Sequence, residues 1–171
     1  MKTDILLVDG YNIIGAWEEL GGMKRKKLAD ARDRLIERMA EYRAHTGWRV
    51  IIIFDAHLVL GVEKRKVLNN VEIVFTRKNE TADERIEKLV TELSGRRVQI
   101  HVATSDLTEQ WVIFAHGALR KSARELELEM NKIDQLISTE VKTIQKQQPL
   151  SKIPLTDEIA EIFEKWRRGM K

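Results

Sequence analysis

Aspartates stand at or just beyond the ends of four predicted strands of this chain. The carboxyl ends of parallel strands meet at one edge of an open sheet, so we expect the four side chains to converge in the crevice there. Carboxylates gathered so closely repel one another unless a cation lies among them. The four residues are Asp9, Asp55, Asp83 and Asp106.

Oxygen ligands of this kind favour a hard divalent metal. Carboxylates suit Mg²⁺ or Mn²⁺ better than zinc, and the four His of the chain show no spacing that suggests a competing ligand set. Such an ion orients a water molecule, lowers its pKa and neutralises charge on a phosphodiester during in-line displacement. We expect Asp9, Asp83 and Asp106 to bind the metal, with Asp55 and Asn12 completing the catalytic site.

Each aspartate also has a structural explanation when it is taken alone. Asp9 would tie down the turn that follows its strand. Asp83 lies between Thr81 and Glu84, which form a helix-capping box, and would complement the helix dipole. Asp106 precedes a predicted helix and would serve as its cap. Four such coincidences at one edge are less plausible than a site, so the set as a whole favours chemistry.

Length and composition bound the class of protein. The chain has 171 residues, which is enough for one domain or for one domain with an appendage. It has no Cys, which excludes a disulfide framework, thiolate zinc sites and cysteine nucleophiles. No signal-peptide pattern opens the sequence and no apolar run approaches the length of a membrane span, so we expect a cytoplasmic protein without a membrane partner.

Basic residues are informative by their placement. The net charge of +3 says little by itself, but several basic clusters flank loops expected near the acidic edge. There they would hold the phosphates of a polyanion, unless they are merely solvated helix ends and loop tips. Trp17, in a segment predicted to be an exposed loop, would stack on a base. The basic residues predicted to bind the polyanion are Lys24, Arg25, Lys26, Lys64, Arg65, Lys66, Arg77, Lys78 and Arg120.

Strands alternate with helices over most of the chain. This order predicts the α/β class, as a three-layer α/β/α sandwich around a mostly parallel sheet. We expect a turn at 10–12, a loop at 13–22 and a short helical turn near 63–68. The strands are predicted at 4–9, 49–54, 71–76 and 98–103, and the helices at 24–44, 82–93 and 106–116.

The pattern after Arg120 is helical throughout. A narrow apolar seam of heptad-like period runs from Leu126 to Ile144. It would lie on the flank of the sheet or, as the less favoured alternative, pair with another subunit, so a monomer is favoured over a dimer. We assign residues 1–150 to the main domain and 151–171 to a helical extension packed on it.

Four motifs together resemble a known family. They are Leu6–Asn12, Ile53–Ala56, Thr81–Asp83 and Val102–Asp106, and they resemble the NYN domain, a branch of the PIN-like metal-dependent ribonucleases. The similarity is greatest to the YacP-like bacterial group. The resemblance implies a Rossmann-like sandwich whose acidic cluster binds Mg²⁺ or Mn²⁺ and hydrolyses RNA endonucleolytically, with a link to mRNA turnover on ribosomes. It carries the acidic positions over to Asp9, Asp55, Asp83 and Asp106, with Asn12 beside the first.

Two rival functions fit parts of the pattern. A phosphatase or phosphotransferase of the haloacid-dehalogenase kind also uses a strand-end Asp, but it requires a second Asp two residues later, where this chain has Tyr11. A non-catalytic RNA- or ribosome-binding module on the same fold stays open. We therefore predict a metal-dependent endoribonuclease, with that module as the alternative.

Overall fold

A six-stranded sheet organises the first of the two units into which the chain divides, Met1–Asp134 and Gln135–Lys171. The computed structural model describes residues 2–24, 27–56, 65–106 and 116–147, together with three positions near the end of the chain, 165, 167 and 169. Most of the predicted extension 151–171 lies outside the described residues. The predicted boundary at 150 therefore stays a prediction.

The sheet confirms the α/β class. Its strand order is β3-β4-β2-β1-β5-β6, and every neighbouring pair is parallel except β3 with β4. The four predicted strands are all present, and β1 lies in the interior of the sheet because it pairs with β2 and β5. The strands are β1 Thr3–Asp9, β2 Arg49–Phe54, β3 Arg65–Leu68, β4 Val71–Phe75, β5 Val98–Ala103 and β6 Leu119–Lys121.

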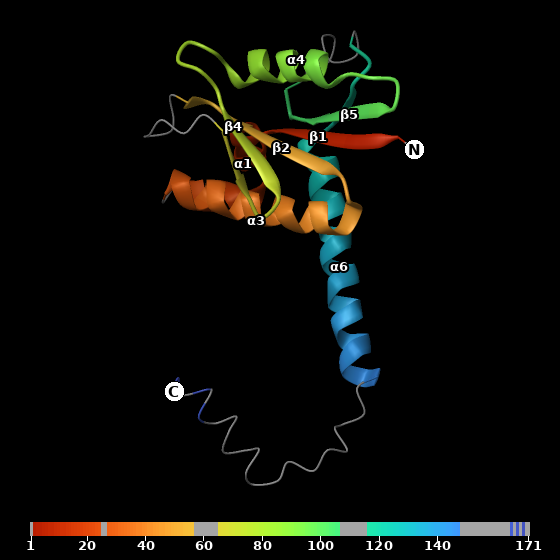
Figure 1. Ribbon diagram of the computed structural model, residues 1–171. Helices are drawn as coiled ribbons and strands as arrows, with labels where there is room; N and C mark the ends of the chain where they lie inside the picture. The colour runs from red at the N-terminus through yellow and green to blue at the C-terminus, as the bar shows by residue number, and fades with distance from the viewer. Residues whose placement is uncertain are drawn as a thin grey trace. The chain divides into compact units, whose positions relative to one another are not determined.

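Helices cover both faces of the sheet, with α3 on one face and α4 on the other (Figure 1). Strand residues alternate between the two faces, so Leu6 and Val8 of β1 pack toward α3 while Ile5 and Leu7 pack toward α4. The helices are α1 Gly10–Ala16, α2 Glu18–Lys24, α3 Leu28–Thr46, α4 Ala82–Leu93 and α6 Ala123–Gln147.

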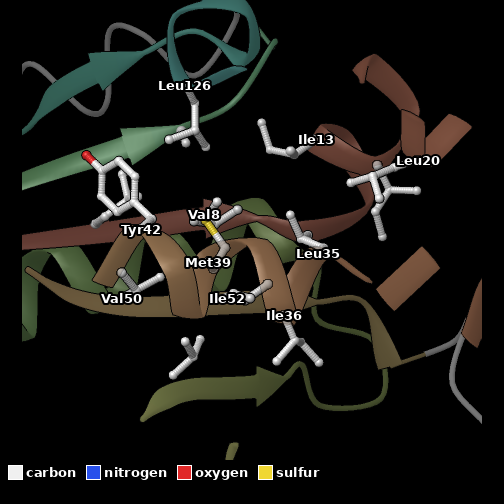
Figure 2. Close-up of a cluster of buried hydrophobic side chains, with 14 of the residues drawn as sticks. Val8, Ile13, Leu20, Leu35, Ile36, Met39, Tyr42, Val50, Ile52 and Leu126 are labelled. Carbon is white, nitrogen blue, oxygen red and sulfur yellow. The ribbon is translucent and has the colours of Figure 1, made fainter. Parts of the chain in front are cut away.

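The larger core lies between the sheet and α3 (Figure 2). Leu35, Met39 and Tyr42 recur at helical spacing on α3 and are fully buried against the strands. The first half of the predicted apolar seam joins this core, since Leu126, Met130 and Ile133 of α6 are buried. The remainder of the seam is exposed at Ile137, Val141 and Ile144.

Several predicted connections proved to be regular structure. The segment predicted as turn and loop at 10–22 forms α1 and most of α2, and the helix predicted from 24 begins at Leu28. The prediction of a short helical turn near 63–68 was wrong for residues 65–68, the part of this segment that the structure describes, because they form the edge strand β3. The helix at 82–93 is confirmed as α4. Residues 107–115 of the last predicted helix lie outside the described residues. Within the described part of the chain, no helix is long and apolar enough to cross a membrane.

Candidate active site

The pleat of the sheet directs two of the strand-end carboxylates toward α4. Leu7 of β1 packs on the α4 face, and Asp9, two residues later, has the same orientation. At the end of β2, Ile53 likewise packs on the α4 face, and Asp55, two residues later, has the same orientation. Because Asp83 lies in the first turn of α4, the two strand ends and this helix terminus bring their carboxylates toward one another.

Asp9 is held tightly at the end of β1. Its exposed fraction is 7%, and it occupies the N-cap position of α1. The next residue is Gly10, and the chain passes close to β2 at this point. A Cβ atom at position 10 would overlap the ring of Phe54 and lie 3.0 Å from the carbonyl oxygen of Ile53, so glycine is required there. Close backbone approach therefore fixes the direction in which Asp9 leaves the sheet.

Asp55 fastens the start of α4 to the end of β2. Its Oδ1 accepts a hydrogen bond of 3.0 Å from the backbone N–H of Ala82. Thr81 is the N-cap residue, as predicted, and its hydroxyl accepts a bond of 3.1 Å from the N–H of Glu84. These two bonds satisfy donors of the first turn and so position Asp83.

Asn12 and Ser105 connect α1 with the loop after β5. The side-chain oxygen of Asn12 accepts from both the backbone N–H and the hydroxyl of Ser105, the latter at 2.7 Å. Thr104 is fully buried, and its hydroxyl accepts from the N–H of Asp106 at 3.1 Å. The oxygen of Asn12 is thus engaged in positioning this loop, and Asp106 is held near the same edge.

The electrostatics show that the acidic residues act on one another. Burial raises the pKa of Asp9 to about 7, with further rises from the charges of Asp83, Asp55 and Asp106, while the nearby N–H of Asn12 opposes them. Burial and the charges of Asp106 and Asp55 raise the pKa of Asp83 to about 6. Among the described residues, no Lys or Arg forms a salt bridge with Asp9, Asp55 or Asp83.

A divalent cation suits this cluster by charge and by donor type. Carboxylates that raise one another's pKa and lack a basic partner are stabilised when a cation enters between them. In the conformation described here, no three carboxylate or imidazole groups of the described chain are arranged to hold one ion together. The charges of Asp83 and Asp106 both act on Asp9, and these three carboxylates are the residues that would hold the cation, while Asp55 and Asn12 anchor neighbouring backbone by hydrogen bonds.

The predicted basic residues are distributed unevenly around this edge. Arg77 and Lys78 follow β4 and are exposed. Arg65 pairs with Glu72, and β3 is separated from β1 by β4 and β2. Lys66 lies over the ring of Phe75, 5.7 Å from its centroid. The Nε of Arg120 is buried without a hydrogen-bond partner in the described part. Arg25, Lys26, Lys64 and the side chain of Lys24 lie outside the described residues.

The expectation that Trp17 stacks on a base was wrong. Its exposed fraction is 3%, and its indole N–H donates a bond of 2.8 Å to the carbonyl oxygen of Ala123. Trp17 lies between α1 and α2 and packs in the α3-side core together with Ile13, Ile14 and Leu20. The helical spacing of these four apolar residues was the signal that this segment is not an exposed loop.

Sequence reasoning missed two residues next to the cluster, Tyr11 and Arg32. Tyr11 packs its ring against Phe54, with the centroids 5.0 Å apart. The guanidinium of Arg32 donates a bond of 3.1 Å to the hydroxyl of Tyr11. No linear motif marks this pair, because the two residues come from different helices and are 21 positions apart.

A mostly parallel α/β sheet with acidic residues gathered at its carboxyl edge is the arrangement of PIN-like nuclease domains. The YacP-like NYN domain family matches residues 6–168, and the chain belongs to that family. It is 57% identical over 166 residues to the uncharacterised protein YacP of Bacillus subtilis strain 168, covering 97% of this chain and 98% of that protein.

Solved structures agree with this membership. The crystal structure of Rae1 (YacP) from Bacillus subtilis matches with a TM-score of 0.77 and 57% identity, over 98% of this chain and 96% of the other. The crystal structure of a mutant of the same Bacillus subtilis protein matches with a TM-score of 0.75 and 52% identity over the same shares. The family and the α/β fold expected from the motifs are thereby confirmed.

Proposed function

We propose that this protein is a metal-dependent endoribonuclease that hydrolyses phosphodiester bonds of RNA. The observation that carries the proposal is the carboxylate cluster around the buried Asp9, in which Asp9 and Asp83 have raised pKa values and no basic partner among the described residues. Membership of a nuclease family supports the reaction class. Bound between Asp9, Asp83 and Asp106, Mg²⁺ or Mn²⁺ would supply an activated water and neutralise phosphate charge.

The chain's own residues would prepare the site in two ways. Close packing at Gly10 and hydrogen bonds at the start of α4 fix the backbone that carries Asp9 and Asp83, so this backbone need not rearrange when the cation enters. Asp55 and Asn12 act as positioning residues, since one anchors α4 and the other anchors the loop that carries Asp106.

The substrate we propose is mRNA, cut in the cytoplasm in a decay process associated with the ribosome. Arg77 and Lys78 are exposed at the edge where β4 ends, which suits contacts with the phosphates on either side of the cut. The link to mRNA and ribosomes rests on the resemblance to the YacP-like group. We propose that the protein acts as a monomer, either on free RNA or on RNA that is bound to the ribosome.

A non-catalytic RNA- or ribosome-binding module is the second candidate. It is favoured by one observation, that no three potential ligands of the described chain are arranged around a single ion. On this alternative the acidic edge would be a remnant of the fold rather than a working site.

Cleavage of a labelled single-stranded RNA in the presence of Mn²⁺, Mg²⁺ or a chelator distinguishes the two candidates. We expect metal-dependent internal cuts by the wild type and none by Asp9→Asn. Asp33→Asn is the matched control, because Asp33 is exposed on α3 and outside the cluster. The same assay on mRNA engaged by translating ribosomes tests the proposed substrate. Equal cleavage by D9N and wild type would refute the site, whereas binding without cleavage in both settings would establish the module.

A further inference from the structure

Arg32 places a positive charge at the edge of the sheet where the carboxylates gather. The helix α3 connects the segment after β1 to the start of β2, so its first turns lie at the carboxyl edge of these parallel strands. Arg32 is the fifth residue of α3 and is half-buried. Its guanidinium points to the hydroxyl of Tyr11, which lies two residues after Asp9.

The other arginines in this part of α3 are neutralised by carboxylates. Arg34 pairs with Glu19 at 2.8 Å and with Glu37 at 3.0 Å. Arg38 pairs with Asp134 and Glu41, both at 2.8 Å. The positive charges of these two arginines are therefore balanced by neighbouring carboxylates, which weakens their attraction for an anionic ligand.

Arg32 differs because its partner is a neutral phenol. In the part of the chain that the structure describes, no Asp or Glu forms a salt bridge with Arg32. A guanidinium has five N–H donors, and the bond to Tyr11 uses one of them. A half-buried cation that lacks a carboxylate partner retains both its charge and its donors for an incoming anion.

The surroundings of Tyr11 connect this cation to the acidic cluster. The hydroxyl of Tyr11 accepts the bond from Arg32, and Tyr11 is the second residue of α1, the helix that Asp9 caps. Its ring is fixed against Phe54, the residue that precedes Asp55. Tyr11 thus links the guanidinium of Arg32 to the start of α1, directly after Asp9 and Gly10.

We propose that Arg32, held by Tyr11, binds a backbone phosphate of the RNA next to the one at the carboxylate cluster. This inference rests on the proposed function for the identity of the ligand. A phosphodiester presents two anionic oxygens in a geometry that the planar guanidinium matches with two parallel hydrogen bonds. Arg32 would be a substrate-binding residue and Tyr11 its positioning residue.

The test is RNA affinity in the absence of divalent metal. Fluorescence anisotropy of a labelled 12-nucleotide oligouridylate, in chelator and over a range of salt concentrations, reports Kd and its salt slope without cleavage. We expect Arg32→Gln to weaken binding about tenfold at low salt. We also expect it to reduce the salt slope by about 0.7, the value of one lost phosphate contact on a single strand. R34Q is the control, since it removes the same charge two residues away from an arginine already paired with glutamates.

Two further variants separate binding from structure. Arg32→Lys keeps the charge, so we expect it to keep the salt slope while losing part of the affinity. Tyr11→Phe keeps the ring against Phe54 and removes the hydroxyl, so we expect a weakening of about threefold from a guanidinium that is less well placed. Thermal unfolding of each variant checks that the fold is intact, and a purely structural role for Arg32 would change the Tm without changing the salt slope.

The outcomes distinguish this inference from the function on which it rests. If R32Q and R34Q weaken binding equally, or neither does, the phosphate site at Arg32 is refuted, whether or not the wild type cleaves RNA. If the wild type binds RNA through Arg32 but never cleaves it, the site stands and the endonuclease proposal fails. A wild type that binds no oligouridylate in chelator at low salt would refute the phosphate site at Arg32, while the endonuclease proposal would still be decided by the cleavage assay with metal.

Discussion

Asp9→Asn replaces the buried carboxylate of the cluster with a neutral side chain of nearly the same shape. Burial and the charges of Asp83 and Asp55 raise the pKa of Asp9 from 3.8 to about 7. At about 1.36 kcal/mol for each pH unit, this corresponds to roughly 4 kcal/mol of lost folding stability when the group is fully ionised. Water and small movements of the neighbouring carboxylates reduce the cost, so we expect D9N to stabilise the metal-free protein by about 1 to 3 kcal/mol.

The sign of this effect defines its pH window. Asp9 binds its proton more tightly in the folded state than in the unfolded state, so the wild type loses stability as the pH rises from 3.8 to about 7. Below that window the carboxyl is neutral in both states, and D9N should have no advantage. Above it the full difference is present. Asp83, whose pKa is raised to about 6, changes in the same direction in both proteins.

Thermal unfolding in chelator at pH 5 and pH 8, with and without Mn²⁺, measures this directly. At pH 8 without metal we expect D9N to melt roughly 2 to 10 °C above the wild type, and we expect the gap to narrow at pH 5. Mn²⁺ should raise the Tm of the wild type at pH 8 and leave that of D9N unchanged, because a cation stabilises the state that binds it. D33N should behave as the wild type in every condition. A D9N protein that melts below the wild type at pH 8 in chelator, or one that Mn²⁺ stabilises equally, would refute the reasoning.

Three further substitutions test how the site is held. Gly10→Ala should destabilise the fold by about 1 to 3 kcal/mol in denaturant unfolding, because the new methyl group meets the fully buried ring of Phe54; unchanged stability would mean that the close approach is absent. Trp17→Phe should lower the Tm by removing the bond to Ala123 while leaving the Kd for RNA unchanged, and a selective loss of RNA affinity would restore the stacking role. Thr81→Ala should cost about 1 kcal/mol by removing the cap of α4, and a neutral result would show that the bond from the N–H of Ala82 to Asp55 suffices to anchor that helix.

The parts of the fold with strong periodic patterns could be predicted from the sequence. The continuous apolar runs before Asp9 and Asp55 gave buried strands, and the capping residue Thr81 fixed the start of α4. Strand direction then placed the acidic residues at one edge. Strand ends and helix caps are local features of a sequence, so the positions of these acidic residues at the sheet edge could be predicted without coordinates.

The remainder depended on contacts that no linear pattern records. The segment 10–22 was predicted as a turn and a loop, but the burial of Ile13, Ile14, Trp17 and Leu20 outweighs the low helix propensity of its four glycines. β3 is a strand because it pairs with β4 across a tight turn in which Asn69 and Asn70 adopt positive φ angles, and β6 has only three residues. The bond that the N–H of Ala82 donates to Asp55 joins residues 27 positions apart, and the bond from Arg32 to Tyr11 joins residues 21 positions apart.

The position of Asp9 itself argues for catalysis over a module that only binds RNA. Phosphates are repelled by carboxylates, so a binding surface gains nothing from burying an acidic group whose neighbours are Asp55, Asp83 and Asp106. The charge lowers the stability of the fold and opposes RNA at the same time. A divalent cation bound there would reduce both effects, because it would offset part of the negative charge of the cluster and would attract the phosphate. Arg32, left without a carboxylate partner among the described residues, supplies positive charge beside this edge even before the cation is present.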